Sequence, residues 1–580
     1  MRDWIKKHHI ALILGIGGLG FFILFSGLNF TAPLRFNSPD ETANYFFIEQ
    51  LAENNSIRYF EDANYYLDGR VHPRSIQVVN GYLVPGGFLG IILIYGLLGK
   101  IITSGLTIYL TPLFSVLAMF AWYAIIKKYF NKWVALLSAL LVGAHPAWWY
   151  YTARGLLPNV LFVSLAILSV FFILVRPIKN WQKKKKPKKK KKEQNWFLEN
   201  IDWLVGGIFL AGSLMVRPSE IIWMMIIGLG LVMFNYKKIN WLGLIIFLIT
   251  TVIVFSPIFF LNNHFYGSPF KTGYQDINNR IVTEEDIGDE SLERPVTTSE
   301  VVEEPVANRW VQGVKTLILP FGFSARNIWN NFVNYHIKFN WWYTVLWAAG
   351  LIFMAVQLGR KKISWPQAQL IIFFGVVSFW LVIVYGSWQF SDNINVGKVT
   401  IGNSYLRYWI PSFVLATPVI AYLLYHVGRI FKFHALQVIW AILIIAAFGA
   451  MGTTTTIFGE DEGLRYVRNH LWRYERISER VVELTEDNAI IITDRSDKIF
   501  FPKRKIVYPF MAEATYDLLP KMYFVAPTYY YSVALTEGAV EYLNNGILAK
   551  KGMRMEKIES FDNEALYIFK YLMMSNESNF

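Results

Sequence analysis

The chain has 580 residues, of which 54% are hydrophobic and 17% aromatic, a composition that excludes an ordinary soluble protein and indicates a multi-pass protein of the cell membrane. It contains no cysteine, which excludes disulfide bonds, thiolate nucleophiles and cysteine metal sites. Much of the net charge of +14 lies in short loops between apolar stretches, where it sets membrane orientation, so we expect no nucleic-acid partner.

The first predicted membrane span runs from Ile10 to Phe30. It holds about twenty residues without an ionisable group, enough to cross a hydrocarbon core about 30 Å thick. Basic residues precede it, which places the N-terminus in the cytoplasm and the following loop on the extracytoplasmic side. No small-residue cleavage site follows a short apolar stretch, so we expect a retained anchor rather than a cleaved signal peptide.

A pair of carboxylates follows this span in the sequence Ser38-Pro39-Asp40-Glu41. These residues match a capping box that opens a helix through Ala52, in which first-turn acidic residues are stabilised by the helix dipole by about 0.3–1 kcal/mol. A second interpretation is catalytic, because a carboxylate at the lipid boundary near cations can accept a proton from a hydroxyl nucleophile.

Ten further apolar stretches predict ten more spans, which gives eleven in total. Placing the basic loops inside yields a consistent alternation with the N-terminus in the cytoplasm and the C-terminus outside. The predicted fold is an all-α polytopic membrane domain with a small C-terminal extracytoplasmic α/β domain. The ten stretches lie at about 104–126, 133–146, 156–175, 201–216, 219–234, 241–261, 341–358, 367–386, 406–426 and 435–452.

The apolar stretch Tyr82–Ile102 does not fit this alternation, because a full span there would place Lys127 and Lys128 outside. It is rich in glycine, so we predict an interfacial or re-entrant helix. Two charged runs are predicted to be loops. Lys183–Lys192 is expected to touch anionic lipid in the cytoplasm, and Glu284–Glu304 to be a flexible outer loop.

Residues 455–580 alternate charged helical stretches with short β-rich runs, which predicts a small α/β domain outside the membrane. The predicted division is a membrane domain at 1–454, with a first outer loop at 31–103 and another outer loop at 262–340, followed by this domain. Its helices are predicted at Glu462–Leu484, Ala512–Met522 and Glu537–Lys550, and its strands at Ala489–Thr493, Lys505–Tyr508, Met522–Ala526 and Ala565–Tyr571.

Ionisable residues are nearly absent from the middles of the predicted spans and gather at their outer ends. Transporters coupled to ions or protons usually hold such groups near the midplane, so this pattern favours chemistry at the outer interface over passage through the bilayer. The outer-end residues are Asp40, Glu41, His72, Arg74, His145, Arg154, Arg217, Glu220, His264, Lys271, Arg326 and Arg407.

Several of these cations are suited to binding a phosphate. Arg407 offers a planar fork of donors beside the hydroxyl of Tyr408, although an arginine at a span end can also simply snorkel to the interface. Arg154 follows an aromatic cluster that is equally typical of an interface belt. Lys271 and Tyr266 lie in a turn-rich loop that is equally typical of a plain connection.

Taken in order, these motifs resemble those of the GT-C superfamily of polyprenyl-phosphate-dependent glycosyltransferases, especially its protein O-mannosyltransferase and aminoarabinose-transferase-like branch. The number and predicted orientation of the spans are also similar. Four elements carry the resemblance: an acidic pair after span one (Asp40, Glu41), a His-Pro element before an apolar interfacial helix (His72, Pro73), an arginine beyond the third span (Arg154), and an Arg-Tyr-x-x-Pro element that opens a late span (Arg407, Tyr408, Pro411).

The resemblance implies a GT-C-like helix arrangement and transfer of a hexosyl or pentosyl group outside the cytoplasm. The donor would be a polyprenyl-phosphate sugar and the acceptor a protein, lipid or glycan, in contact with membrane lipids. No cofactor is expected, with a divalent metal as the alternative. Asp40 would be the base or acceptor-orienting carboxylate, and Glu41 its partner. His72 and Arg74 would hold the acceptor or support the first loop, and donor phosphate or lipid would be bound by Arg407, Tyr408, Arg154, Lys271 and Tyr266.

Two other functions fit the same residues. The first is a lipid-linked glycan ligase or polymerase, which would also act at the outer face but on longer glycans. The second is a non-catalytic transporter or flippase of lipid-linked sugars, and the uncharged span centres count against it.

Overall fold

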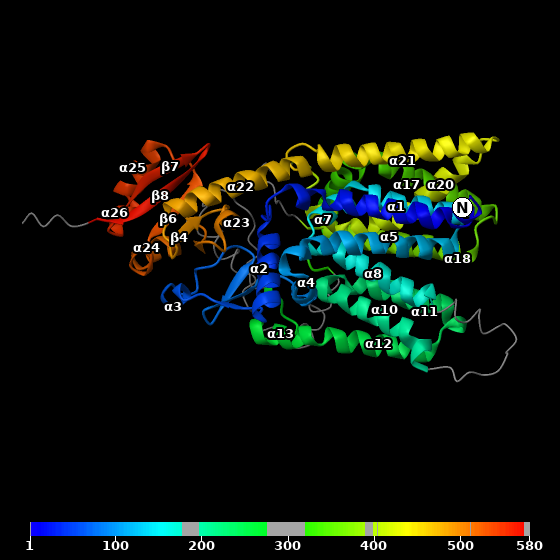
Figure 1. Ribbon diagram of the computed structural model, residues 1–580, viewed down its shortest axis with the longest axis horizontal. Helices are drawn as coiled ribbons and strands as arrows, with labels where there is room; N and C mark the ends of the chain where they lie inside the picture. Colours follow the sequence, from blue (N-terminus) through cyan, green and yellow to red (C-terminus); the bar gives the residue numbers. More distant parts are fainter. Residues whose placement is uncertain are drawn as a thin grey trace, which may run out of the picture. The chain divides into compact units, whose positions relative to one another are not determined.

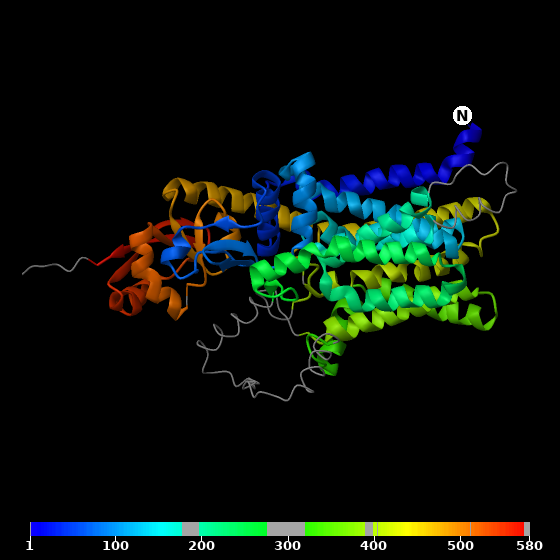
Figure 2. The ribbon, with the colours of Figure 1, turned by 90° about the horizontal axis from the view of Figure 1, so that it is seen from below.

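A computed structural model describes residues 2–176, 196–274, 319–388, 398–402, 404–510 and 512–572 (Figures 1 and 2). The chain forms two compact units. The helical unit comprises residues 1–30, 108–257 and 295–466, and the mixed unit comprises residues 31–107, 258–294 and 467–580. The charged runs Lys183–Lys192 and Glu284–Glu304 lie outside the described residues.

Long apolar helices identify the chain as a multi-pass membrane protein. Within the described ranges, seven helices are long and apolar enough to cross a membrane, and up to nine if each of two sharply bent helix pairs counts as one span. The orientation of the termini stays a prediction. The seven helices are Leu12–Thr31, Ser104–Tyr129, Trp241–Tyr266, Trp341–Gly359, Trp365–Gly386, Ile410–Gly428 and His434–Ile457.

The predicted count of eleven spans is not confirmed. One predicted span forms α6 (Lys132–Ala144), whose 13 residues fall short of the roughly 20 that cross a bilayer. The stretches 201–216 and 219–234 form a pair bent by 113° at Pro218, which lacks the N–H that a continuous helix requires. The second pair, which is bent by 110°, consists of Pro146–Ala153 and Pro158–Leu174.

The helical unit contains helices from three separate parts of the chain. They are α1 (Arg2–Thr31), α5 (Leu110–Tyr129), α6, α7 (Pro146–Ala153), α8 (Pro158–Leu174), α10 (Trp196–Val216), η2 (Pro218–Glu220), α11 (Ile221–Asn235), η3 (Tyr236–Lys238), α12 (Trp241–Phe255), α16 (Ala325–Asn331), η4 (Phe332–Lys338), α17 (Trp341–Gly359), α18 (Trp365–Gly386), α19 (Ser404–Tyr408), α20 (Ile410–Gly428) and α21 (His434–Ile457).

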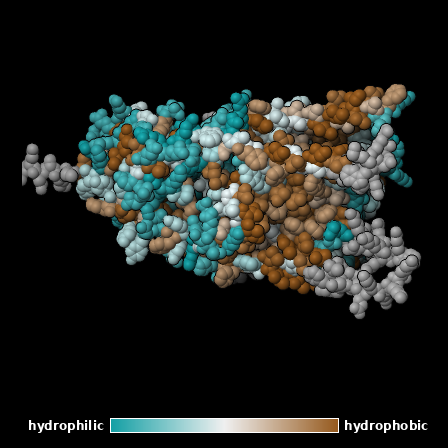
Figure 3. All heavy atoms as spheres, in the orientation of Figure 1, coloured by the Kyte–Doolittle hydropathy of each residue, from teal (hydrophilic) through white to brown (hydrophobic). Residues whose placement is uncertain are grey.

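Buried hydrogen bonds and close backbone approaches pack these helices. The Trp122 indole N–H lies 3.0 Å from Ser138 Oγ and 3.2 Å from Thr417 Oγ1, which joins α5, α6 and α20. A Cβ at Gly207 of α10 would lie 2.6 Å from the Phe247 carbonyl oxygen of α12, so this approach requires glycine. Hydrogen bonds between helices and close backbone approach at glycine are both typical of helix packing in lipid. Figure 3 shows a largely hydrophobic surface over the long helices, as contact with lipid requires.

The first outer loop folds into helices and a small sheet of the mixed unit. Its antiparallel strands have the order β1-β3-β2, and β2 and β3 are joined by Asn80-Gly81, whose φ values of 50° and 80° suit a tight hairpin. The apolar stretch Tyr82–Ile102 is therefore a strand followed by a 13-residue helix. The elements are α2 (Pro39–Asn54), β1 (Tyr59–Phe60), α3 (Ala63–Tyr66), β2 (Ile76–Val79), β3 (Tyr82–Pro85), α4 (Gly90–Ile102) and η1 (Ser104–Tyr109); α13 (Pro257–Tyr266) also contributes to this unit.

The predicted C-terminal α/β domain is confirmed as a five-stranded sheet in the order β5-β4-β6-β8-β7. The strands β5, β4 and β6 are parallel, and β8 and β7 are antiparallel to their neighbours. The elements are α22 (Leu464–Leu484), β4 (Ile490–Thr493), α23 (Asp497–Phe500), β5 (Lys505–Val507), α24 (Glu513–Val525), β6 (Thr528–Val533), α25 (Glu537–Asn545), α26 (Ile547–Lys550), β7 (Met553–Phe561) and β8 (Glu564–Tyr571).

Two details of this domain differ from the prediction. The strand predicted at Met522–Ala526 is wrong, because these residues complete α24, and the strand lies instead at Thr528–Val533. A short apolar run has no periodicity that separates strand from helix, which explains the error. The strand Met553–Phe561 was not predicted, because its charged and exposed residues lack a continuous apolar run.

We predict that Arg504→Ala destabilises the C-terminal domain by about 2–3 kcal/mol. Arg504 is buried, and its guanidinium donates to the carbonyl oxygens of Val482 and Thr485 at the end of α22, at 2.8 and 2.9 Å. Thermal unfolding of the detergent-solubilised full chain measures the effect. The exposed Arg480 on the same helix provides the control, and an Arg480→Ala variant that unfolds as early as Arg504→Ala would contradict this explanation.

Candidate functional site

The predicted helix cap at Asp40 and Glu41 is confirmed. Pro39 occupies the first turn of α2, Ser38 Oγ accepts from Asp40 N at 3.3 Å, and Glu41 Oε2 accepts from Ser38 N at 3.2 Å. The Glu41 side chain is buried, with 3% of its surface exposed. The cap therefore explains the position of Glu41, whereas it engages only the backbone N–H of Asp40.

The Asp40 side chain is held by a serine from a distant part of the first loop. Its Oδ1 accepts a hydrogen bond from the Ser75 hydroxyl at 2.5 Å. The neighbouring Arg74 also interacts electrostatically with Asp40. A partly exposed carboxylate with a fixed orientation, at the N-terminus of a helix, has the features required of a proton acceptor.

Arg74 itself binds the C-terminal domain. Its backbone N–H and its Nε donate to the two carboxylate oxygens of Asp497, at 2.9 and 3.0 Å, and its Nη2 donates to Oδ1 at 2.5 Å. Burial alone would lower the pKa of Arg74, but Asp497, Tyr508 and Asp40 outweigh this effect and raise it. Arg74 therefore joins the first outer loop to the C-terminal domain, and its role in the reaction stays a prediction.

Three other predicted residues lie in the same unit. The buried His72 ring approaches Tyr508 edge-on at 5.4 Å, and its Nδ1 lies 3.0 Å from the Pro73 carbonyl oxygen. The buried Tyr266 donates its hydroxyl to the Pro85 carbonyl oxygen at 2.6 Å, which fixes the end of α13 to β3. Lys271 is half-buried in the turn that follows.

The helical unit contains the two arginines predicted to bind phosphate. Arg154 ends α7, and Arg407 lies in α19. Asn159, in the first turn of α8, donates its side-chain N–H to the Arg407 carbonyl oxygen at 3.3 Å. Tyr151 lies within electrostatic range of both guanidinium groups and of the Glu462 carboxylate. The Arg407 guanidinium also lies 5.1 Å from the ring centre of Tyr408 and donates to its hydroxyl at 3.2 Å.

A buried ion pair next to Tyr408 was not assigned to the site by the sequence. The Arg217 Nη2 lies 2.9 Å from Glu220 Oε1, and the two side chains are almost completely buried. Glu220 also accepts from the hydroxyl of Tyr385 and, at 2.6 Å, from the indole N–H of Trp223. The spacing Arg217-Pro-Ser-Glu220, three residues apart at a helix break, is the signal that could have found this pair.

This ion pair supports the aromatic ring of Tyr408, whose hydroxyl is a predicted phosphate ligand. Tyr385 stacks on Tyr408 with ring centres 4.6 Å apart, and the Arg217 guanidinium lies 4.9 Å from the centre of the same ring. The charge of Arg217 is balanced by Glu220. The binding of a phosphate by Arg407 and Arg154 stays a prediction.

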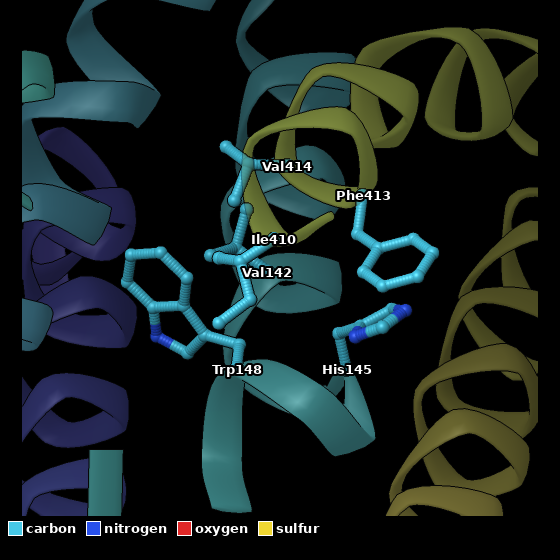
Figure 4. A pocket seen from close by; sticks show the side chains of 6 residues that line it. All are labelled: Val142, His145, Trp148, Ile410, Phe413 and Val414. Carbon is cyan, nitrogen blue, oxygen red and sulfur yellow. The ribbon is translucent and has the colours of Figure 1, made fainter. Parts of the chain in front are cut away.

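His145 has a structural explanation. Its Nδ1 accepts from Ala147 N at 3.2 Å and caps α7. Its ring stacks on Phe413 at 4.4 Å and lines a small apolar pocket with Trp148 and neighbouring aliphatic side chains (Figure 4). The predicted outer-end residues His264 and Arg326 are exposed.

Within the described residues, no three histidine, aspartate or glutamate side chains are placed to share a metal ion. The carboxylate of Glu41 accepts from the cap of its own helix, and Asp40 accepts from Ser75.

Comparisons with solved structures identify the fold, although the sequence matches no family model and no curated protein. The apo oligosaccharyltransferase of Archaeoglobus fulgidus matches with a TM-score of 0.54 and 14% identity, over 94% of this chain and 71% of that chain. The A. fulgidus oligosaccharyltransferase AglB, in complex with an inhibitory peptide and a dolichol-phosphate, matches with a TM-score of 0.52 and 13% identity, over 98% and 74%. ArnT from Cupriavidus metallidurans, bound to undecaprenyl phosphate, gives a TM-score of 0.48 and 8% identity, over 98% and 99%.

The oligosaccharyltransferase matches show that the chain has the GT-C fold. The fold expected from the resemblance is thereby confirmed. The roles of individual residues stay predictions.

We predict that Glu220→Gln destabilises the helical unit by about 3 kcal/mol, because it leaves the buried Arg217 charge without its counter-charge. The double variant Arg217→Gln/Glu220→Gln removes both charges and should recover most of this loss. Thermal unfolding in detergent measures both variants. A double variant that is no more stable than Glu220→Gln would show that the ion pair does not carry this stability.

Proposed function

We propose that the protein is an integral-membrane glycosyltransferase that moves a sugar from a polyprenyl-phosphate donor to an acceptor on the extracytoplasmic face. The observation that carries this proposal is the Asp40 carboxylate, which is oriented by the Ser75 hydroxyl in the loop after the first apolar helix. The GT-C fold supports it. The A. fulgidus oligosaccharyltransferase AglB, which has the same fold, binds a dolichol-phosphate, and this also supports the proposal.

The proposed reaction is a single displacement at the anomeric carbon. The acceptor hydroxyl attacks this carbon, its proton passes to Asp40, and the bond from carbon to phosphate oxygen breaks. The lipid phosphate leaves with an additional negative charge, which Arg407 and Arg154 stabilise. Donors aimed at the charge that develops in the transition state commonly supply the largest catalytic term. The displacement inverts the anomeric configuration.

The remaining residues have supporting roles in this proposal. Tyr408 donates to the phosphate beside Arg407, while Lys271 and Tyr266 contact the lipid headgroup. Glu41 holds the helix that carries Asp40, as its bond to the cap supports. His72 and Arg74 fix the first loop, and His72 contacts the acceptor.

A second candidate is transfer of an oligosaccharide from its lipid carrier, as in a glycan ligase or polymerase. The fold similarity to oligosaccharyltransferases favours it. Offering the purified protein a monosaccharide-linked lipid and an oligosaccharide-linked lipid in parallel separates the two candidates, because only the true donor is consumed at a rate that saturates.

We predict that Asp40→Asn lowers kcat at least about 100-fold, because general-base catalysis typically contributes 10²–10⁴. Turnover of a lipid-linked sugar in proteoliposomes measures the loss. Ser38→Ala is the matched control, since it removes only the cap and costs about 1 kcal/mol of stability. It should keep most of the activity. An Asp40→Asn variant with normal turnover would refute the proposed role.

We predict that Arg407→Gln lowers kcat about 100- to 1,000-fold, because a charged donor to the leaving phosphate is lost. Arg407→Lys should recover part of the rate, since it restores a positive charge without the planar fork. The exposed Arg326 in α16 provides the control, and Arg326→Gln should transfer sugar at the native rate. Equal losses for Arg407→Gln and Arg326→Gln would contradict a specific phosphate contact.

A further inference from the structure

The carboxyl ends of the parallel strands in the C-terminal domain are covered by the first outer loop. In sheets of this kind, ligands bind at the edge where the parallel strands end. Here Asp497 and the Arg495 carbonyl, which follow β4, bind Arg74, and Tyr508, which follows β5, contacts His72. A segment of the same chain therefore occupies the position where such a sheet would hold a ligand.

The contact between Arg74 and Asp497 is tight and desolvated. The Asp497 side chain is 1% exposed, and it accepts three hydrogen bonds from the backbone and guanidinium of the same arginine. Charge-assisted bonds with several donors are strong and have a defined geometry. This contact fixes the backbone immediately before Ser75.

The same loop is anchored in the core of the domain at a second place. Ala63, Leu67 and Val71 are buried in one hydrophobic cluster with the residues of β4 and β8. Lys505 of β5 pairs with Glu61 and Asp62. Contacts with Glu61 and with the Lys505 ammonium lower the pKa of Asp62 to about 2. Residues 61–75 therefore pack as part of the C-terminal domain, although about 400 residues separate this segment from that domain in the sequence.

The short helix α23 also holds the segment that leads into α2. Lys498 Nζ donates to the Asn37 carbonyl oxygen at 2.5 Å, one residue before the cap of α2. The Arg35 guanidinium donates to the Ile499 carbonyl oxygen at 2.9 Å. One element of the C-terminal domain thus contacts both segments that meet at Asp40.

Ser75 has a backbone conformation that needs such support. Its φ of 61° lies in the left-handed region, which is unfavourable for a residue other than glycine. Its carbonyl oxygen accepts from Gly86 N at 3.0 Å, and its hydroxyl donates to Asp40 Oδ1. Such strain persists where surrounding contacts determine it, and it concentrates at functional sites.

We propose that the C-terminal domain positions the proposed catalytic base through the chain Asp497–Arg74–Ser75–Asp40. This inference rests on the proposed role of Asp40. Asp497, Arg74 and Ser75 are positioning residues, because they act on the reaction only through the orientation of the Asp40 carboxylate. The domain is thus a structural support of the active site rather than a separate binding module.

The test is a double-mutant cycle on kcat with Ser75→Ala and Asp497→Asn. Misplacing a reacting group by about 1 Å costs on the order of 100-fold in rate. Each single variant should therefore lower kcat about 10- to 100-fold while the donor KM stays within about twofold. In the Ser75→Ala background, Asp497→Asn should lower kcat less than about twofold further, because the same contact is already lost.

A general loss of folded enzyme gives a different pattern. The kcat of the double variant would then fall by the product of the two single-variant effects. That result would overturn the inference. Arg473→Gln is the matched control, since it breaks an ion pair of 2.6 Å with Glu564 in the same domain and should leave kcat unchanged. If Asp497→Asn misfolds, Ser75→Ala alone still decides, and its native kcat in a folded protein would overturn the inference.

The two hypotheses fail in different ways. If Asp40→Asn turns over normally, the proposed base is wrong. If Asp40→Asn is inactive while Ser75→Ala and Asp497→Asn retain native kcat, the base stands and only the positioning chain is wrong.

Discussion

The hydrogen bond between Ser75 and Asp40 is the contact on which the geometry of the candidate site in the mixed unit depends. It links a helix whose start is fixed by local sequence to a loop whose conformation is fixed by distant residues. A capping box alone would leave the Asp40 side chain free to rotate, whereas the serine hydroxyl selects one orientation. The buried carboxylate of Asp497 holds the arginine next to that serine, so the loop and the C-terminal sheet form one support.

The helical unit is subject to a different physical constraint, because it holds cationic side chains at the ends of apolar helices. The buried Arg217 donates hydrogen bonds to Glu220 and Tyr385, and Trp223 donates to the same Glu220. These contacts stabilise the buried charge. That neutral group packs against Tyr408, whose ring centre also lies 5.1 Å from the guanidinium of Arg407.

Local patterns predicted much of this structure. The cap at Ser38, the long apolar helices and most of the C-terminal strands follow from spacing and composition within a few residues. What the sequence could not reveal depends on residues far apart: Arg74 and Asp497 are 423 positions apart, and no local pattern pairs them. The division between the stretches 201–216 and 219–234 was predicted from hydropathy, whereas the bend of 113° between them depends on tertiary packing that hydropathy does not report.

We propose that the protein forms a glycosidic bond by direct displacement from a lipid phosphate. The most direct test is to incubate the full chain in proteoliposomes with a polyprenyl-phosphate sugar and an acceptor, then determine the anomeric configuration of the product by NMR. We expect a glycosylated acceptor with the configuration inverted relative to the donor. A product with retained configuration, or lipid-linked sugar that crosses the bilayer without any new glycosidic bond, would refute direct displacement.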